Sequence, residues 1–502
     1  MPASTAPSLP LVAWTQPRAA GRGVRRFAGL PARLSVIAAL LLVLLTSTML
    51  VSGQSSQLTL LFPVFATVLG ALLLASNPGY FVGYALWLWM LSPFIRRVVD
   101  AQNGWNSQNP ILLAPLLVCA LCAIDVVRYA SRLQRVAALP FVLAITSLCA
   151  GVAVGLFLSP PALVLYASLT WIAPVLLGLY VAIHPEHHDR IHLAVVQSLS
   201  IGLIVLGIYG VAQFISPAVW DRLWMVNSRM DSIGTPLPFR VRVFSTMNAP
   251  GPLAQFLSAS MLLLFAQRSA KKLLPLLAGL AIFLLSLARS AWLGFFFGFV
   301  LLMVLAPRRV RHAALIFMGI VSMAFVAANS TPLPVALDSM RQTITTRLTT
   351  VGDLAMDDSF RARRYLIPAL LGEIADRPLG SGLGATLVGG AHGSASSRLA
   401  DQGLYLDNGV LEIFLVLGWF GGALFLLSTI VGVAMSLRVV LARREGYGYL
   451  AAAVALITQI VGGTIFAGIG GVMFWTSVGM ALTTSSATDG NKGSGVVMNS
   501  AR

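Results

Sequence analysis

The sequence predicts an all-α membrane protein: a polytopic bundle of about 12–14 transmembrane helices with one large loop that contains short helices. Hydrophobic residues make up 57% and charged residues only 10% of the 502 residues, whereas about 25% of the residues in a globular domain are charged. The apolar residues form repeated runs of about 20 residues, the length that crosses a bilayer core. Lys and Arg lie in short clusters between these runs, and the net charge is +17.

In order along the chain, we expect a basic segment at 1–33, a bundle of about 11 helices at 34–329, a large loop at 330–407, further transmembrane helices at 408–483 and a disordered tail at 484–502. The last apolar run could be one tilted helix or two short helices broken at Gly462-Gly463. The apolar runs are 34–52, 57–75, 79–95, 110–124, 138–158, 162–183, 193–215, 249–266, 273–288, 291–306, 313–329, 408–437 and 449–483.

The basic clusters predict which side each loop faces, because Lys and Arg accumulate in short cytoplasmic loops. If the N-terminal cluster from Arg18 to Arg33 is cytoplasmic, every second loop is also cytoplasmic, and five of these later loops are basic. This scatter between apolar runs argues against a nucleic-acid partner. The later basic clusters are Arg128/Arg132/Arg135, Arg190, Arg268/Lys271/Lys272, Arg308/Arg309/Arg311 and Arg438/Arg443/Arg444.

Three segments on the opposite side also contain arginine: the loop at 216–248, the turn at 286–290 and the large loop at 330–407. Loops as long as the last are usually functional or disordered, and helical spacing at 340–351 and 360–378 favours order. An arginine at a membrane boundary can simply anchor a helix by reaching to the headgroups. Its planar guanidinium also matches phosphate. Arg289 is the strongest functional candidate, because it lies in a tight turn between two apolar runs.

Arg242, Arg289 and Arg361, if they met at one face, would bind a lipid diphosphate, with the lipid tail in the membrane and the attached group under the large loop. The spacing alone leaves this open. The spacing of four histidines is compatible with a metal cluster: His184, His187, His188 and His192. They lie on the predicted cytoplasmic side, away from the arginines, and a solvated loop is the favoured interpretation.

Four stretches of the chain resemble the O-antigen ligase and O-antigen polymerase superfamily of bacterial inner membranes. RVRVFSTMNAPGPLAQF is similar to the family's segment before a span, and SLARSAWLG to its Ser-Arg turn. FRARRYLIPALLGEIADRPLGSGLG resembles its Arg-rich helix with Pro-Leu-x-Gly-x-Gly, and DNGVLEIFLVLGWFG its His-Asn and Gly-x-x-Gly spacing. The stretches begin at Arg240, Ser286, Phe360 and Asp407 and end by Gly421.

The resemblance implies a glycosyltransferase of the inner membrane that uses an undecaprenyl-pyrophosphate-linked oligosaccharide at the periplasmic face, with no metal and no cofactor. Ligases of the family have His where this chain has Asp407, which favours polymerisation of repeat units into a surface polysaccharide or exopolysaccharide. The alternative is a ligase that transfers the glycan to lipid A-core or to a protein. Other assembly proteins, such as a flippase or a chain-length regulator, are possible partners.

Asp407 is the first candidate for the base that accepts the proton of the attacking hydroxyl, although it could equally pair with an arginine or cap the following helix. His392 could enter the site from its glycine-rich loop or remain solvated. Asn408 and Arg364 are expected to support the site. Glu412, one turn into the helix, is expected to be protonated or paired with an arginine such as Arg289.

Two other functions remain open. A small-anion transporter predicts charged residues near the middle of the bilayer on broken helices, and the sequence shows neither clearly. A structural role, in which the large loop recruits partner proteins, would leave Arg289 and Asp407 without a purpose.

Overall fold

The computed structural model describes residues 32–228, 230, 233–267, 269–328, 334–349, 367–368, 370–385 and 408–492. Across these residues the regular elements are helical, with 17 α-helices and one isolated antiparallel bridge between Gly234 and Val241. The protein is therefore an all-α membrane protein, as predicted. The described segments long and apolar enough to cross a membrane are Ser55–Ser76, Pro110–Arg128, Val136–Leu158, Pro161–Ile183, Pro185–Ile215 and Gly409–Arg443.

Each predicted apolar run forms a helix, or two helices in succession. Helix α3 extends about two turns beyond its predicted end, and the helical spacing at 340–351 forms α14. The elements in chain order are α1 (Ala32–Val51), α2 (Leu58–Ser76), α3 (Pro78–Asn103), α4 (Leu113–Ala120), α5 (Cys122–Arg128), α6 (Leu139–Leu158), α7 (Pro161–Ile183), α8 (His188–Ile215), α9 (Val219–Asn227), α10 (Pro250–Phe265), α11 (Leu273–Leu285), α12 (Arg289–Leu305), α13 (Arg308–Ala328), α14 (Val335–Thr349), α17 (Gly409–Arg443), α18 (Tyr447–Ile457), the 3₁₀ helix η9 (Thr458–Gly462) and α19 (Gly468–Lys492).

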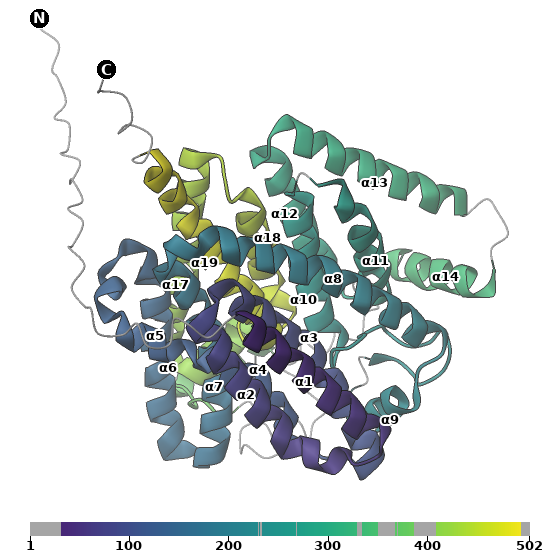
Figure 1. The fold of residues 1–502 in the computed structure, drawn as a ribbon, viewed down its shortest axis with the longest axis horizontal. Helices are drawn as coiled ribbons and strands as arrows, with labels where there is room; N and C mark the ends of the chain where they lie inside the picture. Colours follow the sequence, from purple (N-terminus) through teal and green to yellow (C-terminus); the bar gives the residue numbers. More distant parts are fainter. Residues whose placement is uncertain are drawn as a thin grey trace, which may run out of the picture.

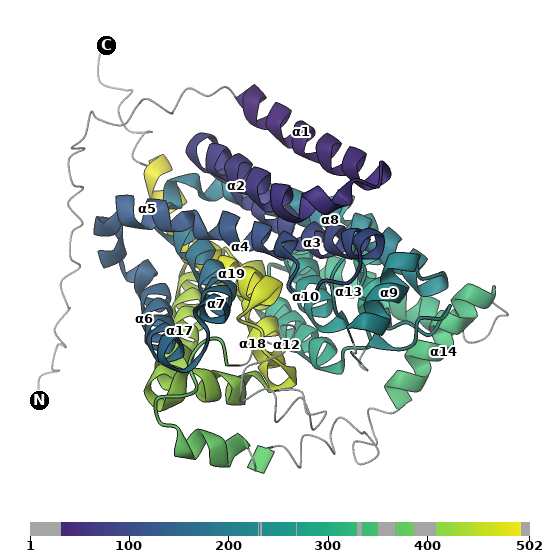
Figure 2. The ribbon, with the colours of Figure 1, turned by 90° about the horizontal axis from the view of Figure 1, so that it is seen from below.

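Glycines let the central helices of the bundle approach one another closely (Figure 1). A Cβ on Gly178 of α7 would lie 2.5 Å from the Trp475 backbone oxygen of α19, and one on Gly298 of α12 would lie 2.7 Å from the Ala451 oxygen of α18. Small residues at such contacts are typical of membrane helix packing, where van der Waals contact replaces the hydrophobic effect. Helices α7, α12, α18 and α19 therefore form the centre of the bundle, while α1 lies at its edge beside α2 (Figure 2).

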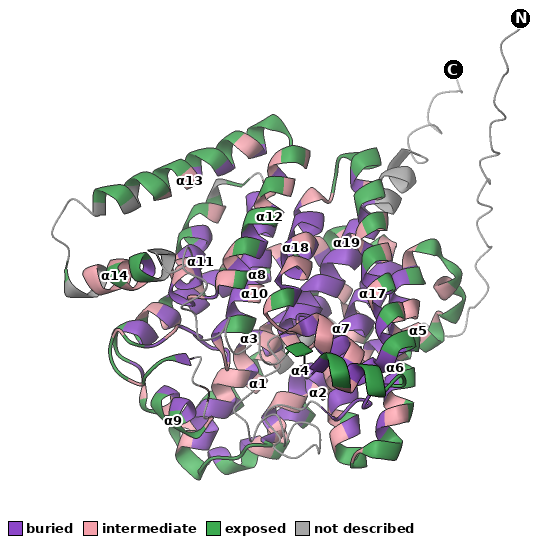
Figure 3. Ribbon diagram, turned by 180° about the vertical axis from the view of Figure 1, so that it is seen from behind, coloured by how far each residue is buried: buried purple, intermediate pink, exposed green. Residues whose placement is uncertain are grey.

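Large apolar side chains remain exposed on the outer helices, as expected for surfaces that face lipid. Phe157 is 90% exposed and Phe420 is 85% exposed. Helix α13 carries a row of exposed residues and runs obliquely past the end of α12 (Figure 3). The crossing of the bilayer by α13 stays a prediction.

Segments that the basic clusters place on one side of the membrane do meet at one end of the bundle. His192 Nδ1 lies 2.7 Å from the Tyr449 hydroxyl, and His188 Nδ1 lies 2.9 Å from Thr483 Oγ1. Tyr447 donates a hydrogen bond to the Ala266 carbonyl at 3.3 Å. The alternation of loops between two faces is consistent with these contacts, and the assignment of this end to the cytoplasm stays a prediction.

Two of the apolar segments contain a break. Gly418, with φ 70° and ψ −171°, interrupts α17, and residues 463–467 separate η9 from α19. The second break falls at the predicted Gly462-Gly463, and α19 then continues to Lys492, beyond the start predicted for the tail at 484. No ionisable residue lies at either break, from 413 to 421 or from 458 to 468, so the charge pattern expected of a transporter is still missing there.

A glycine-rich segment of the large loop, residues 378–382, fills the break in α17. The Ser381 and Gly382 amides donate to the Leu415 and Val416 carbonyls at 2.8 and 2.9 Å, and the Trp419 amide donates to the Pro378 carbonyl at 2.9 Å. These bonds satisfy backbone groups that the break in the helix releases. The structure packs these glycines inside the bundle against α6 and α17.

Replacement of Gly418 with alanine should strongly destabilise this junction. Its backbone lies in a region that only glycine adopts readily, and a Cβ would lie 2.4 Å from the Pro378 oxygen. We expect a loss of about 1–3 kcal/mol or more, measured as a lower thermal unfolding midpoint of the purified protein. Gly372→Ala is the matched control, because a Cβ at that helical position meets nothing within 4 Å. Equal midpoints for the two variants would contradict the role assigned to Gly418.

Candidate functional site

Arg242 joins two of the predicted motif segments. Its Nε donates to the Ser286 carbonyl at 3.3 Å and its Nη2 donates to the Leu287 carbonyl at 3.3 Å. One residue on, the Val243 amide donates to the Leu285 carbonyl at 3.1 Å. The chain around Arg242 is therefore fixed to the turn that precedes Arg289, although more than 40 residues separate the two arginines in the sequence.

The turn at 286–288 is as tight as its sequence suggested. Leu287 has φ 54°, a left-handed conformation that is uncommon for a residue with a side chain. Ala288 then precedes Arg289, which is the first residue of α12 and is half-buried. The guanidinium of Arg289 is thus carried at the end of the helix rather than on a flexible loop, because the turn has no spare residues.

The break between η9 and α19 borders this turn and two further helices. A Cβ on Gly462 would lie 2.5 Å from Ser290 Cβ, and one on Gly409 would lie 2.6 Å from the Gly463 oxygen. Gln255 Nε2 donates to the Thr464 carbonyl at 3.1 Å. The 462–464 segment therefore touches the first turns of α12 and α17 and the second turn of α10.

The N-termini of α12 and α17 thus lie beside this segment. The amide groups of a first helical turn have no partner within the helix and carry a partial positive charge, which favours a bound anion. Arg289 adds a full positive charge at the start of α12, and Arg242 lies beside the preceding turn. The combination is chemically suited to a phosphate or diphosphate group.

At the start of α17, Asn408 is the N-cap. Its Oδ1 accepts hydrogen bonds from the Val410 and Leu411 amides at 3.0 and 3.2 Å, and the roles weighed for Asp407 stay predictions. Glu412 is buried one turn further on, with 9% of its surface exposed, and its pairing with Arg289 stays a prediction. Asp407, His392, Arg361 and Arg364 lie outside the described residues.

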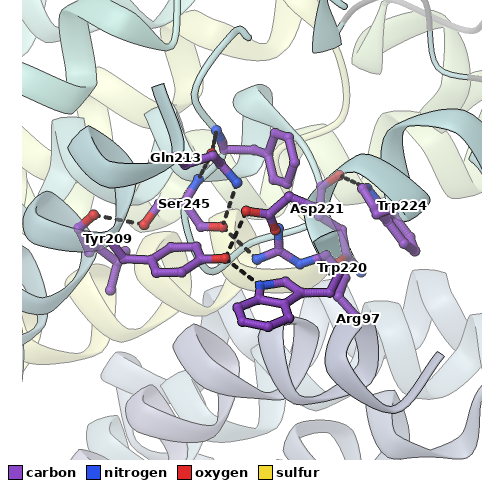
Figure 4. A network of polar contacts seen from close by, with 10 residues as sticks. Arg97, Tyr209, Gln213, Trp220, Asp221, Trp224 and Ser245 are labelled. Carbon is purple, nitrogen blue, oxygen red and sulfur yellow. Dashed lines mark hydrogen bonds and ion pairs between the residues drawn. The ribbon is translucent and has the colours of Figure 1, made fainter. Parts of the chain in front are cut away.

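The sequence interpretation missed a buried polar network at the same end of the bundle (Figure 4). Arg97 of α3 forms an ion pair with Asp221 of α9, and both side chains are fully buried. The Tyr209 hydroxyl donates to the other Asp221 oxygen at 2.7 Å, and Trp220 Nε1 donates to the Tyr209 hydroxyl at 2.7 Å. The sequence feature that could have indicated this network is the pair Arg96-Arg97, which directly follows the apolar run 79–95.

This network positions the segment that carries Arg242. Arg97 Nη2 donates to the Ser245 carbonyl at 2.5 Å, while Gln213 Oε1 accepts from the Phe244 and Ser245 amides at 3.0 and 2.9 Å. Ser245 itself has φ 50°. The buried ion pair therefore acts on the arginine site through the backbone three residues beyond Arg242.

The histidines at the opposite end are not a solvated loop, contrary to the favoured interpretation. His184 is 4% exposed, and its Nδ1 lies 2.9 Å from the Tyr180 carbonyl oxygen. Burial lowers the pKa of His184 below its usual value of about 6.5. His188 and His192 contact Thr483 and Tyr449. Within the described part of the chain, no group of three or more His, Cys, Asp or Glu side chains is arranged to hold a metal ion.

A family model covers three of the four stretches that resemble the superfamily, those that begin at Ser286, Phe360 and Asp407. Residues 274–426 match the family model described as O-antigen ligase, Wzy_C. The resemblance to the O-antigen ligase and polymerase superfamily is confirmed for this part of the chain. The match includes Arg289 and the helix behind Asn408, and it begins after Arg242. No curated protein and no solved structure matches the chain.

The match to the O-antigen ligase family supports a polymerase-like or ligase-like transfer of glycan by a multi-pass membrane protein. A large apolar cavity lies outside the matched range of residues. That cavity, of about 670 Å³, is lined by residues of α1, α2, α3 and α8. None of the predicted site residues that the structure describes lines it.

Proposed function

We propose that the protein polymerises oligosaccharide repeat units carried on undecaprenyl pyrophosphate, at the periplasmic face of the bacterial inner membrane. The observation that supports this most is the contact between Arg242 and the turn before Arg289, at the N-terminus of α12. The donor's diphosphate would bind there, with its polyprenyl chain in the bilayer and its glycan toward the large loop.

In the proposed reaction, a hydroxyl oxygen of the acceptor sugar attacks the anomeric carbon of the donor. The bond between that carbon and the diphosphate oxygen breaks, and the electron pair leaves with the diphosphate. Arg242 and Arg289 stabilise the negative charge that develops on the leaving group, and such fixed donors are typically worth a few kcal/mol each. Asp407 accepts the proton of the attacking hydroxyl. His392, Arg361 and Arg364 of the large loop would complete the site.

The ligase alternative shares the donor and differs in the acceptor. The O-antigen ligase description of the matched family favours it, whereas Asp407 at the position of the ligase histidine favours the polymerase. Both acceptors need the same diphosphate site, so the arginine geometry supports the two equally. The choice between them depends on which product forms.

Glycan analysis in a deletion strain distinguishes these functions. Complementation with the wild type should restore a ladder of chain lengths, and Asp407→Ala should leave single repeat units on the carrier, with comparable amounts of protein in the membrane. Long chains that remain on the carrier and never reach an acceptor in the deletion strain would instead identify a ligase. Unchanged glycan in the deletion strain would refute glycan transfer and favour the transporter.

A further inference from the structure

A second cavity, of about 310 Å³, lies between the C-terminal end of α3 and α9. It borders the polar network of Figure 4, which contributes Arg97, Trp220 and Trp224 to its wall. Its volume is at the lower end of the range for small-molecule sites. The full lining is Arg97, Asp100, Ala101, Gly104, Trp105, Trp220, Leu223, Trp224 and Asn227.

Three tryptophans and a few buried polar groups make up most of this lining. Trp224 is 5% exposed and its ring centroid lies 5.1 Å from that of Trp105, which keeps 38% of its surface exposed. Indole rings offer flat apolar surfaces, while Asp100 and Asn227 offer hydrogen-bond acceptors and donors beside them. Sugar rings present the complementary pattern, with apolar C–H faces and hydroxyl groups around the edge.

The charges of the cavity are balanced, which suits a hydroxylated ligand better than a phosphate. Arg97 is paired with Asp221, and Arg96 donates from Nε to Asp100 Oδ2 at 3.2 Å. Arg97 Nε is nevertheless buried without a hydrogen-bond partner among the described residues. Because the Arg97 side chain is fully buried, this nitrogen lies behind the cavity wall and is not among the groups that face a ligand.

The cavity wall is held in place before any ligand binds. The Arg96 guanidinium lies 5.4 Å from the Trp105 ring centroid and 4.8 Å from that of Trp224. Arg96 Nη2 also donates to the Asn106 carbonyl at 2.7 Å. Asn109 Nδ2 donates to Asp100 Oδ1 at 2.7 Å. The loop after α3 is therefore fixed around Trp105, and little ordering would be required on binding.

The wall of this cavity is also connected to the arginine site. Arg97 bonds the Ser245 carbonyl, and Trp224 Nε1 donates to the Asn248 carbonyl at 2.9 Å. Both carbonyls belong to the segment that starts at Arg242 and leads into α10. A glycan whose diphosphate is bound at the arginine site would thus have a second contact surface at the same end of the bundle.

We propose that this cavity is a subsite for a sugar ring of the carrier-linked glycan, an assignment that rests on the proposed function. Trp105 packs against the ring, while Asp100 and Asn227 bond its hydroxyls. The subsite holds the glycan away from the reacting bond, so it contributes to binding and to the length of the product rather than to the chemical step.

Saturation-transfer NMR on the full chain in lipid nanodiscs tests the subsite, with glucose, galactose, N-acetylglucosamine and glucuronate as separate probes at millimolar concentration. We expect transfer from the wild type to at least one of the sugars. Trp105→Ala should weaken this binding about threefold to tenfold, and Trp105→Phe should weaken it less. Phe420→Ala removes an exposed aromatic side chain outside the cavity and should change nothing.

Two results would overturn the subsite: no transfer to any of the four sugars from the wild type, or equal binding by the wild type and Trp105→Ala. Arg289→Ala separates this test from the proposed function. It should bind the sugar normally while forming no glycan ladder. If Arg289→Ala still forms the ladder but sugar binding depends on Trp105, the diphosphate assignment fails and the sugar subsite stands.

Discussion

Arg289→Ala should lower the rate of glycan transfer by about 10²- to 10³-fold, the loss expected when one fixed donor to a developing negative charge is removed. Arg289 begins α12 directly after a strained turn. No other residue from 286 to 292 is basic, so no neighbouring side chain can replace its charge. In cells, the expected product is single repeat units on the carrier, resolved by gel electrophoresis.

Arg308→Ala is the matched control for this prediction. Arg308 is exposed and begins α13, just after the other end of α12, so it tests the loss of a helix-end arginine without the site. Arg289→Lys should recover only part of the rate, because lysine keeps the charge and loses the planar fork. A normal ladder from Arg289→Ala, at a normal protein level in the membrane, would show that the arginine is only a membrane anchor.

Asp221→Asn should destabilise the protein by about 3–5 kcal/mol, because it leaves the Arg97 charge buried without its partner. Both side chains are fully buried in the ion pair. The measurement is the unfolding midpoint of the purified protein, together with its amount in the membrane. The double variant Arg97→Met with Asp221→Leu should lose less than the sum of the single variants, since it leaves no charge in the interior.

The pair of Arg341 and Asp338 on α14 supplies the control for that prediction. Their side chains are 25% and 33% exposed, so Asp338→Asn should cost less than about 1 kcal/mol. Similar losses from Asp221→Asn and Asp338→Asn would contradict the structural importance of the buried pair. Because Arg97 also holds the Ser245 carbonyl, a partly folded Asp221→Asn protein should transfer glycan more slowly as well.

The sequence by itself determined the class of the protein. Runs of about 20 apolar residues can satisfy their backbone in a bilayer only as helices, so the helices formed by those runs could be predicted. Helix α9, in the loop at 216–248, was not predicted, and α3 and α19 extend beyond their predicted ends. The break at Gly462-Gly463 was also visible, because two consecutive glycines interrupt a run too long for one span. Arg289 was singled out correctly as the start of a helix after a tight turn.

Only the tertiary structure decided which distant residues meet. Nothing in local spacing indicates that Arg242 bonds the turn before Arg289, that Arg97 pairs with Asp221, or that residues 378–382 fill the gap opened at Gly418. Helical periodicity records which face of a segment is apolar, whereas these contacts depend on how separate helices pack and on where broken helices leave backbone groups to be satisfied. The sequence therefore determined most of the helices, and packing determined the site.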